Sequence, residues 1–192
     1  MSVTSHTKNV SIKSFEYGFL PVEMRMPLKF GGESVSHVNC LRVVAEVVNS
    51  EGQRAKGWGE TPLSVTWAWP SATLSYDERY DTMVAFCECA AESFVEVNET
   101  GHPMEIGHVF LAERLPSVLE AFNQCHSTEP MPYLAALIVL SAFDIAVHDA
   151  YGNLHQIDIY DTYNSGYMNH DLSHYFRSSP EADRFKGMFP ND

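Results

Sequence analysis

The segment from Tyr133 to Asp149 constrains the fold most, because as a helix it would be apolar on nearly every side. Its large apolar residues are Leu134, Leu137, Ile138, Val139, Leu140, Phe143, Ile145 and Val147. A helix that is hydrophobic all round has to be covered from several directions at once. The chain is therefore expected to fold around this helix, and Gly152 is placed to end it in a left-handed cap.

The residues before position 61 have the pattern of strands. Apolar and polar residues alternate over 12–30, and Pro27 within this run indicates an edge strand or a strand end. A Val-rich strand is predicted over 38–48, followed by a turn over 49–52 and a returning strand over 53–60. This part of the chain is expected to form an antiparallel meander of about three strands.

Beyond the meander, apolar residues recur every three or four positions, which is typical of helices. Ser75 and Glu78 have the spacing of a capping box and predict the start of a first helix. A second helical stretch is predicted over 104–115, continued by Pro116 as a first-turn proline. The predicted fold class is α+β, with a three-stranded antiparallel meander followed by a bundle of about three helices.

The charge of the chain excludes some partners. The 192 residues include 12 Lys and Arg against 25 Asp and Glu, for a net charge of −13. Nucleic acids and anionic membranes are bound by basic surfaces, so neither is an expected partner. The chain has no uninterrupted apolar run of about 18 residues, and residues 1–13 lack the apolar core of a signal peptide. Four scattered cysteines fit reduced thiols, so a cytoplasmic protein is expected.

Three motifs follow one another along the chain. They are Arg25-Met26-Pro27-Leu28-Lys29-Phe30, then Glu51-Gly52 with Gly57-Trp58-Gly59-Glu60, then Ala142-Phe143-Asp144-Ile145-Ala146-Val147-His148-Asp149-Ala150-Tyr151-Gly152. In this order they resemble the N-terminal capping domain of the enolase superfamily, in its mandelate racemase and muconate-lactonising branch. The resemblance covers residues 10–155.

The resemblance implies a division of labour between two domains. In the family, a (β/α)₈ barrel holds Mg²⁺ on three carboxylates and supplies the bases that remove a proton beside a substrate carboxylate. The capping domain has no metal ligand and covers the site with two loops that select the distal part of the substrate. The resemblance thus implies no catalytic residue and no bound cofactor in this chain, with Mg²⁺ in the full-length enzyme.

The two loops of the resembled domain correspond to residues 27–36 and 61–70. The candidate substrate-binding residues on them are Lys29, Phe30, Glu33, Leu63, Ser64, Val65, Thr66, Trp67 and Trp69. Gly31 and Gly32 would let the first loop move. The alternative interpretation is that Trp67 and Trp69 pack their loop against the first helix and that Lys29 is a solvated charge.

The C-terminal part of the chain departs from the family pattern. No Leu-Leu-Gly stretch follows Gly152, and there is neither a Lys-x-Lys pair nor a set of three acidic residues at barrel spacing. The predicted organisation is a flexible arm over 1–11, a capping domain over 12–152 and an irregular extension toward a missing barrel over 153–192.

Three hypotheses follow. In the first, the chain is the substrate-selecting, site-closing capping domain of a Mg²⁺-dependent racemase, epimerase, cycloisomerase or acid-sugar dehydratase. Its partners would then be a small carboxylate substrate and a barrel, in the same chain or a separate one. In the second, it is a stand-alone binding or assembly module whose residues 153–192 fold back over the surface left by the barrel, or which buries that surface by self-association. In the third, it is an unrelated small α+β protein.

Two pairs of side chains with helical spacing are candidates for chemistry, one of two histidines and one of an aspartate and a histidine. His170 and His174 have metal-ligand spacing on a helix, but structural sites need more ligands, so a solvated tail is favoured. Asp144 and His148 are four residues apart and are expected to pair on one helix face.

Overall fold

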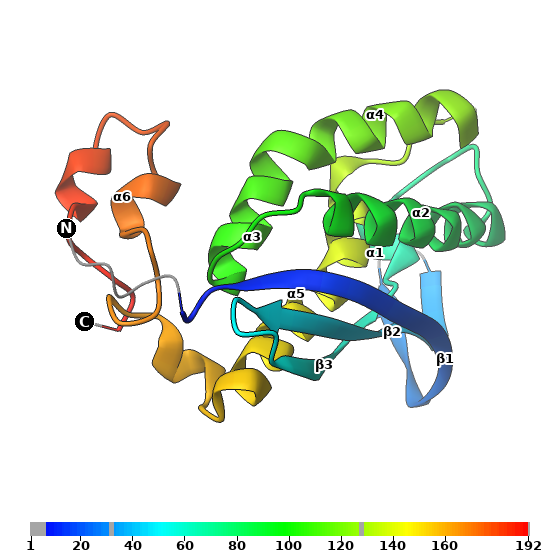
Figure 1. The fold of residues 1–192 in the computed structure, drawn as a ribbon. Helices are drawn as coiled ribbons and strands as arrows, with labels where there is room; N and C mark the ends of the chain where they lie inside the picture. The colour runs from blue at the N-terminus through cyan, green and yellow to red at the C-terminus, as the bar shows by residue number, and fades with distance from the viewer. Residues whose placement is uncertain (1–6, 31–32, 127–128, 192) are drawn as a thin grey trace.

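The computed structural model describes residues 7–30, 33–126 and 129–191, with the side chains of Phe30 and Glu33 excepted. A three-stranded sheet carries a layer of helices on one face, and the C-terminal residues form a small lobe beside the start of the sheet (Figure 1). The predicted α+β class is confirmed.

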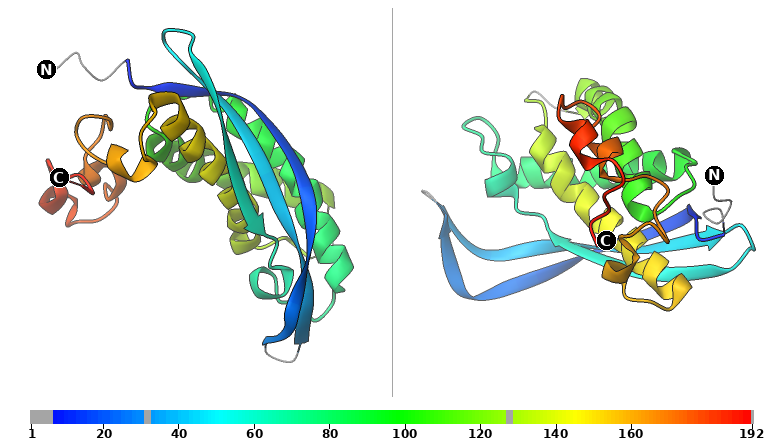
Figure 2. Two further views of the ribbon diagram at one scale, coloured as in Figure 1. Left: turned by 90° about the horizontal axis from the view of Figure 1, so that it is seen from below. Right: turned by 90° about the vertical axis from the view of Figure 1, so that its left-hand side faces the viewer.

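The sheet is an antiparallel meander in the order β1-β2-β3. Its strands are β1 (Val10–Phe30), β2 (Glu33–Asn49) and β3 (Arg54–Pro62). Pairing of β2 with β3 ends at Cys40 and Pro62, whereas pairing of β1 with β2 continues to Phe30 and Glu33. We call the two-stranded extension over 20–38 the hairpin; it projects away from the helices (Figure 2).

The prediction of a loop over 27–36 is wrong, because residues 28–30 of β1 pair with residues 33–35 of β2. The irregularity lies instead in β1, where the register shifts between Glu23 and Leu28. Pro27 falls inside this bulge on an edge strand, where its missing N–H costs no ladder hydrogen bond. Gly31 and Gly32 lie outside the described residues.

The helices pack on the face of the sheet that carries Leu41, Val43, Ala45 and Val47, all of them buried. The helical elements are α1 (Val65–Ala68), α2 (Tyr76–Glu96), α3 (Pro103–Val109), the π-turn η1 (Phe110–Arg114), α4 (Leu115–His126), α5 (Tyr133–His155), η2 (Ile159–Thr162), α6 (Leu172–Tyr175) and η3 (Ala182–Phe185).

The predicted start of the first helix is confirmed at α2. The Ser75 side chain accepts the Glu78 N–H, and the Glu78 carboxylate accepts the Ser75 N–H at 2.8 Å. The stretch predicted over 104–115 begins at α3 and runs through η1 into α4, where Pro116 is the second residue. Because the π-turn widens the helix there, the proline is accommodated without a break.

Helix α5 packs directly on β3 through residues without bulk. A Cβ on Gly57 would lie 2.0 Å from the Ala150 backbone nitrogen, and one on Gly59 would lie 2.0 Å from the Ala142 carbonyl oxygen. The two glycines of the Gly-Trp-Gly-Glu motif therefore permit the close approach of helix and sheet. By length and composition alone, α5 could cross a membrane, but half of its most apolar part is buried inside the fold.

The predicted end of α5 at Gly152 is wrong. The helix continues to His155, and Gln156 takes the left-handed conformation at φ 55°. Gly152 lies inside the helix because the following chain folds back on it, with the Ile157 N–H bonded to the Gly152 carbonyl at 3.1 Å. This hydrogen bond, together with the left-handed Gln156, ends the helix.

The C-terminal lobe is fixed to the start of α3 by a buried carboxylate. Glu105 accepts the backbone N–H groups of Asn169 and His170 at 2.5 and 3.0 Å, and the Asn169 side-chain amide at 2.5 Å. The lobe lies at the end of α5 and not along it (Figure 1). Ile145 on α5 consequently stays 46% exposed.

Candidate functional site

An apolar cavity of about 420 Å³ lies between the hairpin and the chain that follows β3. Its lining residues are Met24, Leu28, Val35, Val38, Pro62, Leu63, Ser64, Val65, Thr66, Trp67 and Tyr76. The two segments that the sequence pairs as loops, 27–36 and 61–70, thus contribute to the same cavity.

The second segment supplies most of the predicted residues that line the cavity. Leu63 and Val65 are buried, Ser64 and Thr66 are half-buried, and Trp67 is 48% exposed. All five line the cavity because the chain turns into the short helix α1 directly after β3.

The remaining predicted residues have other positions. Trp69 is buried and donates its Nε1–H to Glu129 at 2.9 Å, so the packing interpretation describes it. Lys29 is exposed on β1 and is not among the lining residues. The backbones of Phe30 and Glu33 end β1 and begin β2, but their side chains lie outside the described residues.

Sequence reasoning missed several residues of the cavity. Met24, Val35, Val38 and Tyr76 belong to strands and to the first turn of α2, where apolar residues are normally assigned to a core. For the strand residues, only the alternation of apolar and polar side chains along β1 and β2 could have indicated that they share a surface. The bulge in β1 shifts this alternation, so the pattern alone does not locate them.

One wall of the cavity is held by polar contacts; we call residues 61–76 the fixed wall. Glu129 accepts hydrogen bonds from Trp69, Ser71 and Thr73, and these donors lower the pKa of its carboxyl group. Arg79 is buried and donates to the Trp69 carbonyl oxygen at 2.5 Å and to the Ser75 carbonyl oxygen at 3.0 Å.

The other wall is the hairpin, which depends on strand pairing. Its lining side chains are half-buried or exposed, with Leu28 at 55% exposure. Among the described residues, the cavity lining includes no Asp, Glu, Lys, Arg or His. Its polar groups are the hydroxyls of Ser64, Thr66 and Tyr76, and burial raises the pKa of the Tyr76 phenol. This surface fits an apolar group, with few positions that can orient a polar one.

The described residues do not fit a metal ion. Among them, no three or more His, Cys, Asp or Glu side chains come together in a group that could hold a metal. The rings of His170 and His174 stack at 4.1 Å between centroids, and His174 also contacts His108 at 5.5 Å. Stacked rings do not converge their nitrogens on one point, so we assign them no metal.

A second polar group lies where α5 meets the C-terminal lobe. His102 is fully buried, and burial lowers its pKa to about 3. Its Nδ1 accepts the Met104 N–H, so Nε2 carries the proton and donates to Thr162 at 2.9 Å. The expected pair of Asp144 and His148 is present at 3.5 Å. We interpret this group as structural, because its hydrogen bonds join α3 to η2.

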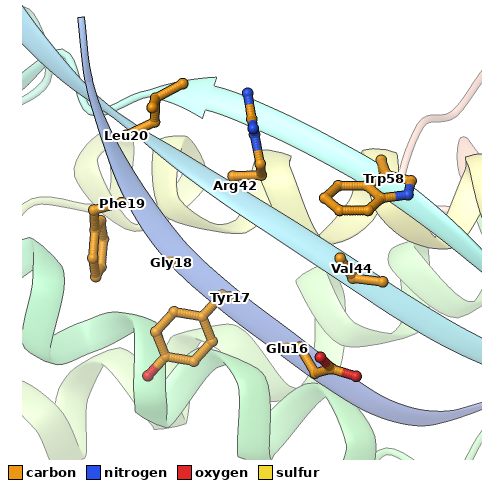
Figure 3. A pocket seen from close by; sticks show the side chains of 8 residues that line it. All are labelled: Glu16, Tyr17, Gly18, Phe19, Leu20, Arg42, Val44 and Trp58. Carbon is orange, nitrogen blue, oxygen red and sulfur yellow. The ribbon is translucent and has the colours of Figure 1, made fainter.

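A different hollow, of about 280 Å³, lies on the face of the sheet opposite the helices. Figure 3 shows Trp58, Val44 and Arg42 beside the bare backbone of Gly18, with Leu20 and Glu16 at its ends. None of the residues predicted as substrate-binding lines it.

Comparison with known proteins gave matches among solved structures only. No protein-family model matches the chain, and no curated protein does. The structure of L-Ala-D/L-Glu epimerase from Bacillus subtilis matches 80% of this chain at 15% identity, with a TM-score of 0.44. A dipeptide epimerase from Enterococcus faecalis V583 matches 81% at 15% identity and a TM-score of 0.39.

A putative mandelate racemase/muconate lactonizing enzyme from Roseovarius nubinhibens ISM matches 71% of this chain at 14% identity, with a TM-score of 0.37. The name of this third protein is that of the superfamily branch whose capping domain the three sequence motifs resemble. The chain spans 29–35% of the length of the three matched structures.

Proposed function

We propose that this chain is the substrate-selecting, site-closing capping domain of an enolase-superfamily enzyme. The apolar cavity between the hairpin and the fixed wall is the observation that carries the proposal. It lies between the two segments that correspond to the covering loops of the resembled domain, and β3 and α5, which hold the other two motifs, form the scaffold behind it.

The chemistry of the lining narrows the proposed substrate. The whole enzyme would act on a carboxylate as a racemase, epimerase, cycloisomerase or dehydratase. An apolar lining favours a substrate whose distal part is aliphatic or aromatic, because that part loses contact with water on binding. A polyhydroxylated distal part, as in an acid sugar, would leave hydroxyl groups buried without partners. We therefore place acid-sugar dehydration last among the four reactions.

The proposed role of this chain's own residues is binding, orientation and exclusion of water. Trp67 and Leu63 would contact the distal group, while Ser64 and Thr66 offer hydroxyls that can orient it. Proton removal and Mg²⁺ binding would belong to a barrel in the same polypeptide or a separate chain. We place the assembled enzyme in the cytoplasm.

The mass of the native protein tests this proposal. The protein is isolated from its own cells, and its intact mass is measured under denaturing and native conditions. We expect either a denatured mass well above 21.6 kDa or a heavier partner under native conditions that carries the metal-binding carboxylates. An assembly made only of 21.6 kDa chains would contradict the proposal.

The C-terminal lobe supports a second candidate, a stand-alone binding module. The lobe closes back on α3 through Glu105 and on the N-terminal segment, where Lys8 donates to the Gly166 carbonyl at 2.8 Å. A chain leading onward to a barrel does not require this closure. Isolation of only 21.6 kDa chains that bind an apolar carboxylate would favour the module.

A further inference from the structure

The outer face of the sheet, opposite the helices, has an exposed tryptophan next to a hollow. Trp58 stands at the middle of β3 and is 60% exposed. The hollow lies over Gly18 on β1, which pairs with Arg42 on the central strand (Figure 3). A glycine inside a strand weakens the strand and often marks a place where another group approaches the backbone closely.

Neither the backbone conformation nor the packing of this fold requires Gly18. Its φ is not positive, and a Cβ built on it would meet nothing within 4 Å. Gly57 and Gly59 differ from it, because a Cβ at either position would clash with the backbone of α5. The hollow is therefore open space on the outer face, of a size suited to an aromatic side chain.

The charges around the hollow balance. Two ion pairs have a member in its lining, Lys56–Glu16 at 2.8 Å and Arg42–Glu60 at 2.6 Å, and a third, Arg54–Glu46 at 3.1 Å, lies further along β2 and β3. The whole chain has a net charge of −13, so two copies repel each other over most of their surfaces. A locally neutral face with interspersed signs lets two copies approach, and each ion pair can exchange partners across the contact.

The sheet edges are less suited to association than the face. On β3, the Asp149 carboxylate accepts the Trp58 N–H at 2.8 Å, and the Asn153 amide donates to the Lys56 carbonyl at 3.0 Å. On β1, the edge contains Pro21 and Pro27, which cannot donate to an added strand.

From this juxtaposition we propose that the chain forms a two-fold symmetric dimer through the outer face of its sheet. Trp58 of each copy sits in the hollow over Gly18 of the other, flanked by Val44 and Leu20. A two-fold contact is self-complementary, so one exposed tryptophan and one hollow per copy are enough. The proposal depends on the outer face and not on the apolar cavity, so it is independent of the capping function.

Sedimentation and light scattering of the full chain over a wide range of concentrations test the dimer. Wild-type chain is expected at twice 21.6 kDa. Trp58→Ala removes the inserted side chain, and Gly18→Leu places a side chain in the hollow at a position where a Cβ meets nothing within 4 Å. Each substitution is expected to raise the dissociation constant roughly tenfold or more. Tyr160→Ala, at another exposed aromatic residue, is the matched control and should leave the mass unchanged.

Mixing the two variants provides the sharpest test. The Gly18→Leu chain keeps its Trp58, and the Trp58→Ala chain keeps its hollow, so a mixed dimer regains one of the two contacts. The mixture should therefore associate more tightly than either variant alone. Circular dichroism confirms that both variants are folded. A monomeric wild-type chain, or a dimer that either variant leaves intact, would overturn the proposal.

Discussion

The two walls of the apolar cavity are built by different means. The fixed wall is held by Glu129 and Arg79, which bond to several groups of residues 69–75. The hairpin is a two-stranded ribbon beyond the end of β3 whose side chains are largely exposed. Polar anchoring fixes one wall in a single position, while the other can change its lining at little cost to the fold. Substitutions on the hairpin should therefore change the cavity lining with a smaller loss of stability than substitutions in the fixed wall.

The largest expected change in the free energy of unfolding is a difference between alanine substitutions at the two tryptophans of the fixed wall. Trp69→Ala is expected to lower the free energy of unfolding by about 3–5 kcal/mol, because it leaves a cavity where a fully buried ring was. Trp67→Ala should cost less than about 1 kcal/mol, since this side chain is half exposed. Urea unfolding measures both. Equal losses would show that the fixed wall is not anchored through Trp69.

A pair of arginine substitutions compares the walls directly. Arg79→Met is expected to cost about 1–3 kcal/mol, because it leaves the Trp69 carbonyl without its buried donor. Arg25→Met makes the same chemical change at an exposed position of the hairpin and should stay within about 0.5 kcal/mol. Thermal unfolding of the two variants is the measurement. A cost for Arg25→Met as large as that for Arg79→Met would remove the distinction.

Acid should weaken the fold in two stages. His102 is neutral when folded, with its pKa lowered to about 3, so the unfolded chain binds more protons below pH 6.5. Stability should fall by up to about 1.4 kcal/mol for each pH unit as the pH drops from about 6 toward 3. His108, His155 and His174 also have pKa values lowered by burial and act in the same direction.

The lowered pKa of Glu129 adds a second loss at lower pH. Its contribution is present above its ordinary pKa of 4.5 and disappears as the pH falls through the folded value, which loosens the fixed wall. His102→Gln should reduce the slope between pH 6.5 and 4.5 to the part due to the other histidines and leave the later loss from Glu129. Urea midpoints at a series of pH values measure this. An unchanged slope in the variant would show that His102 does not carry the first stage.

The smallest effects on stability belong to the hairpin. Leu28→Ser and Met26→Ser should each change the free energy of unfolding by less than about 1 kcal/mol, since the two side chains are 55% and 73% exposed. Only Leu28 lines the cavity, so only its substitution should weaken binding of hexanoate, by roughly three- to tenfold.

Tryptophan fluorescence follows the binding in the assembly that the mass measurement identifies, and the Trp67→Ala variant shows how much of the signal comes from the tryptophan that lines the cavity. Gluconate, a polyhydroxylated carboxylate, serves as the matched comparison ligand and should bind more weakly than hexanoate. Tighter binding of gluconate would contradict the assignment of an apolar distal group.

Local patterns determined the main elements of this fold. The three-stranded meander, the capping box at Ser75 and the central apolar helix follow from periodicity and short-range hydrogen bonding. The Gly-Trp-Gly-Glu motif could be located in advance as well. Only the packed structure shows why the motif needs its glycines. A Cβ at either glycine would lie 2.0 Å from a backbone atom of α5.

Tertiary structure alone decided the composition of the cavity. Leu63, Ser64, Thr66 and Trp67 follow one another along the chain, so a local motif could indicate them together. Their partners on the hairpin are distant in sequence, and the β1 bulge sets which of them face the cavity. Trp69 belongs to the same loop segment, 61–70, as Trp67, but its indole nitrogen donates to Glu129 instead.

The sequence by itself determined the three-stranded meander and the main helices, because hydrophobic periodicity and capping depend on neighbours within a few residues. Only the tertiary structure decided where α5 ends, which wall of the cavity is anchored and why Gly18 leaves a hollow beside Trp58. These features depend on contacts between segments far apart in the chain. No local pattern encodes such contacts, because each is set by the register and packing of the complete fold.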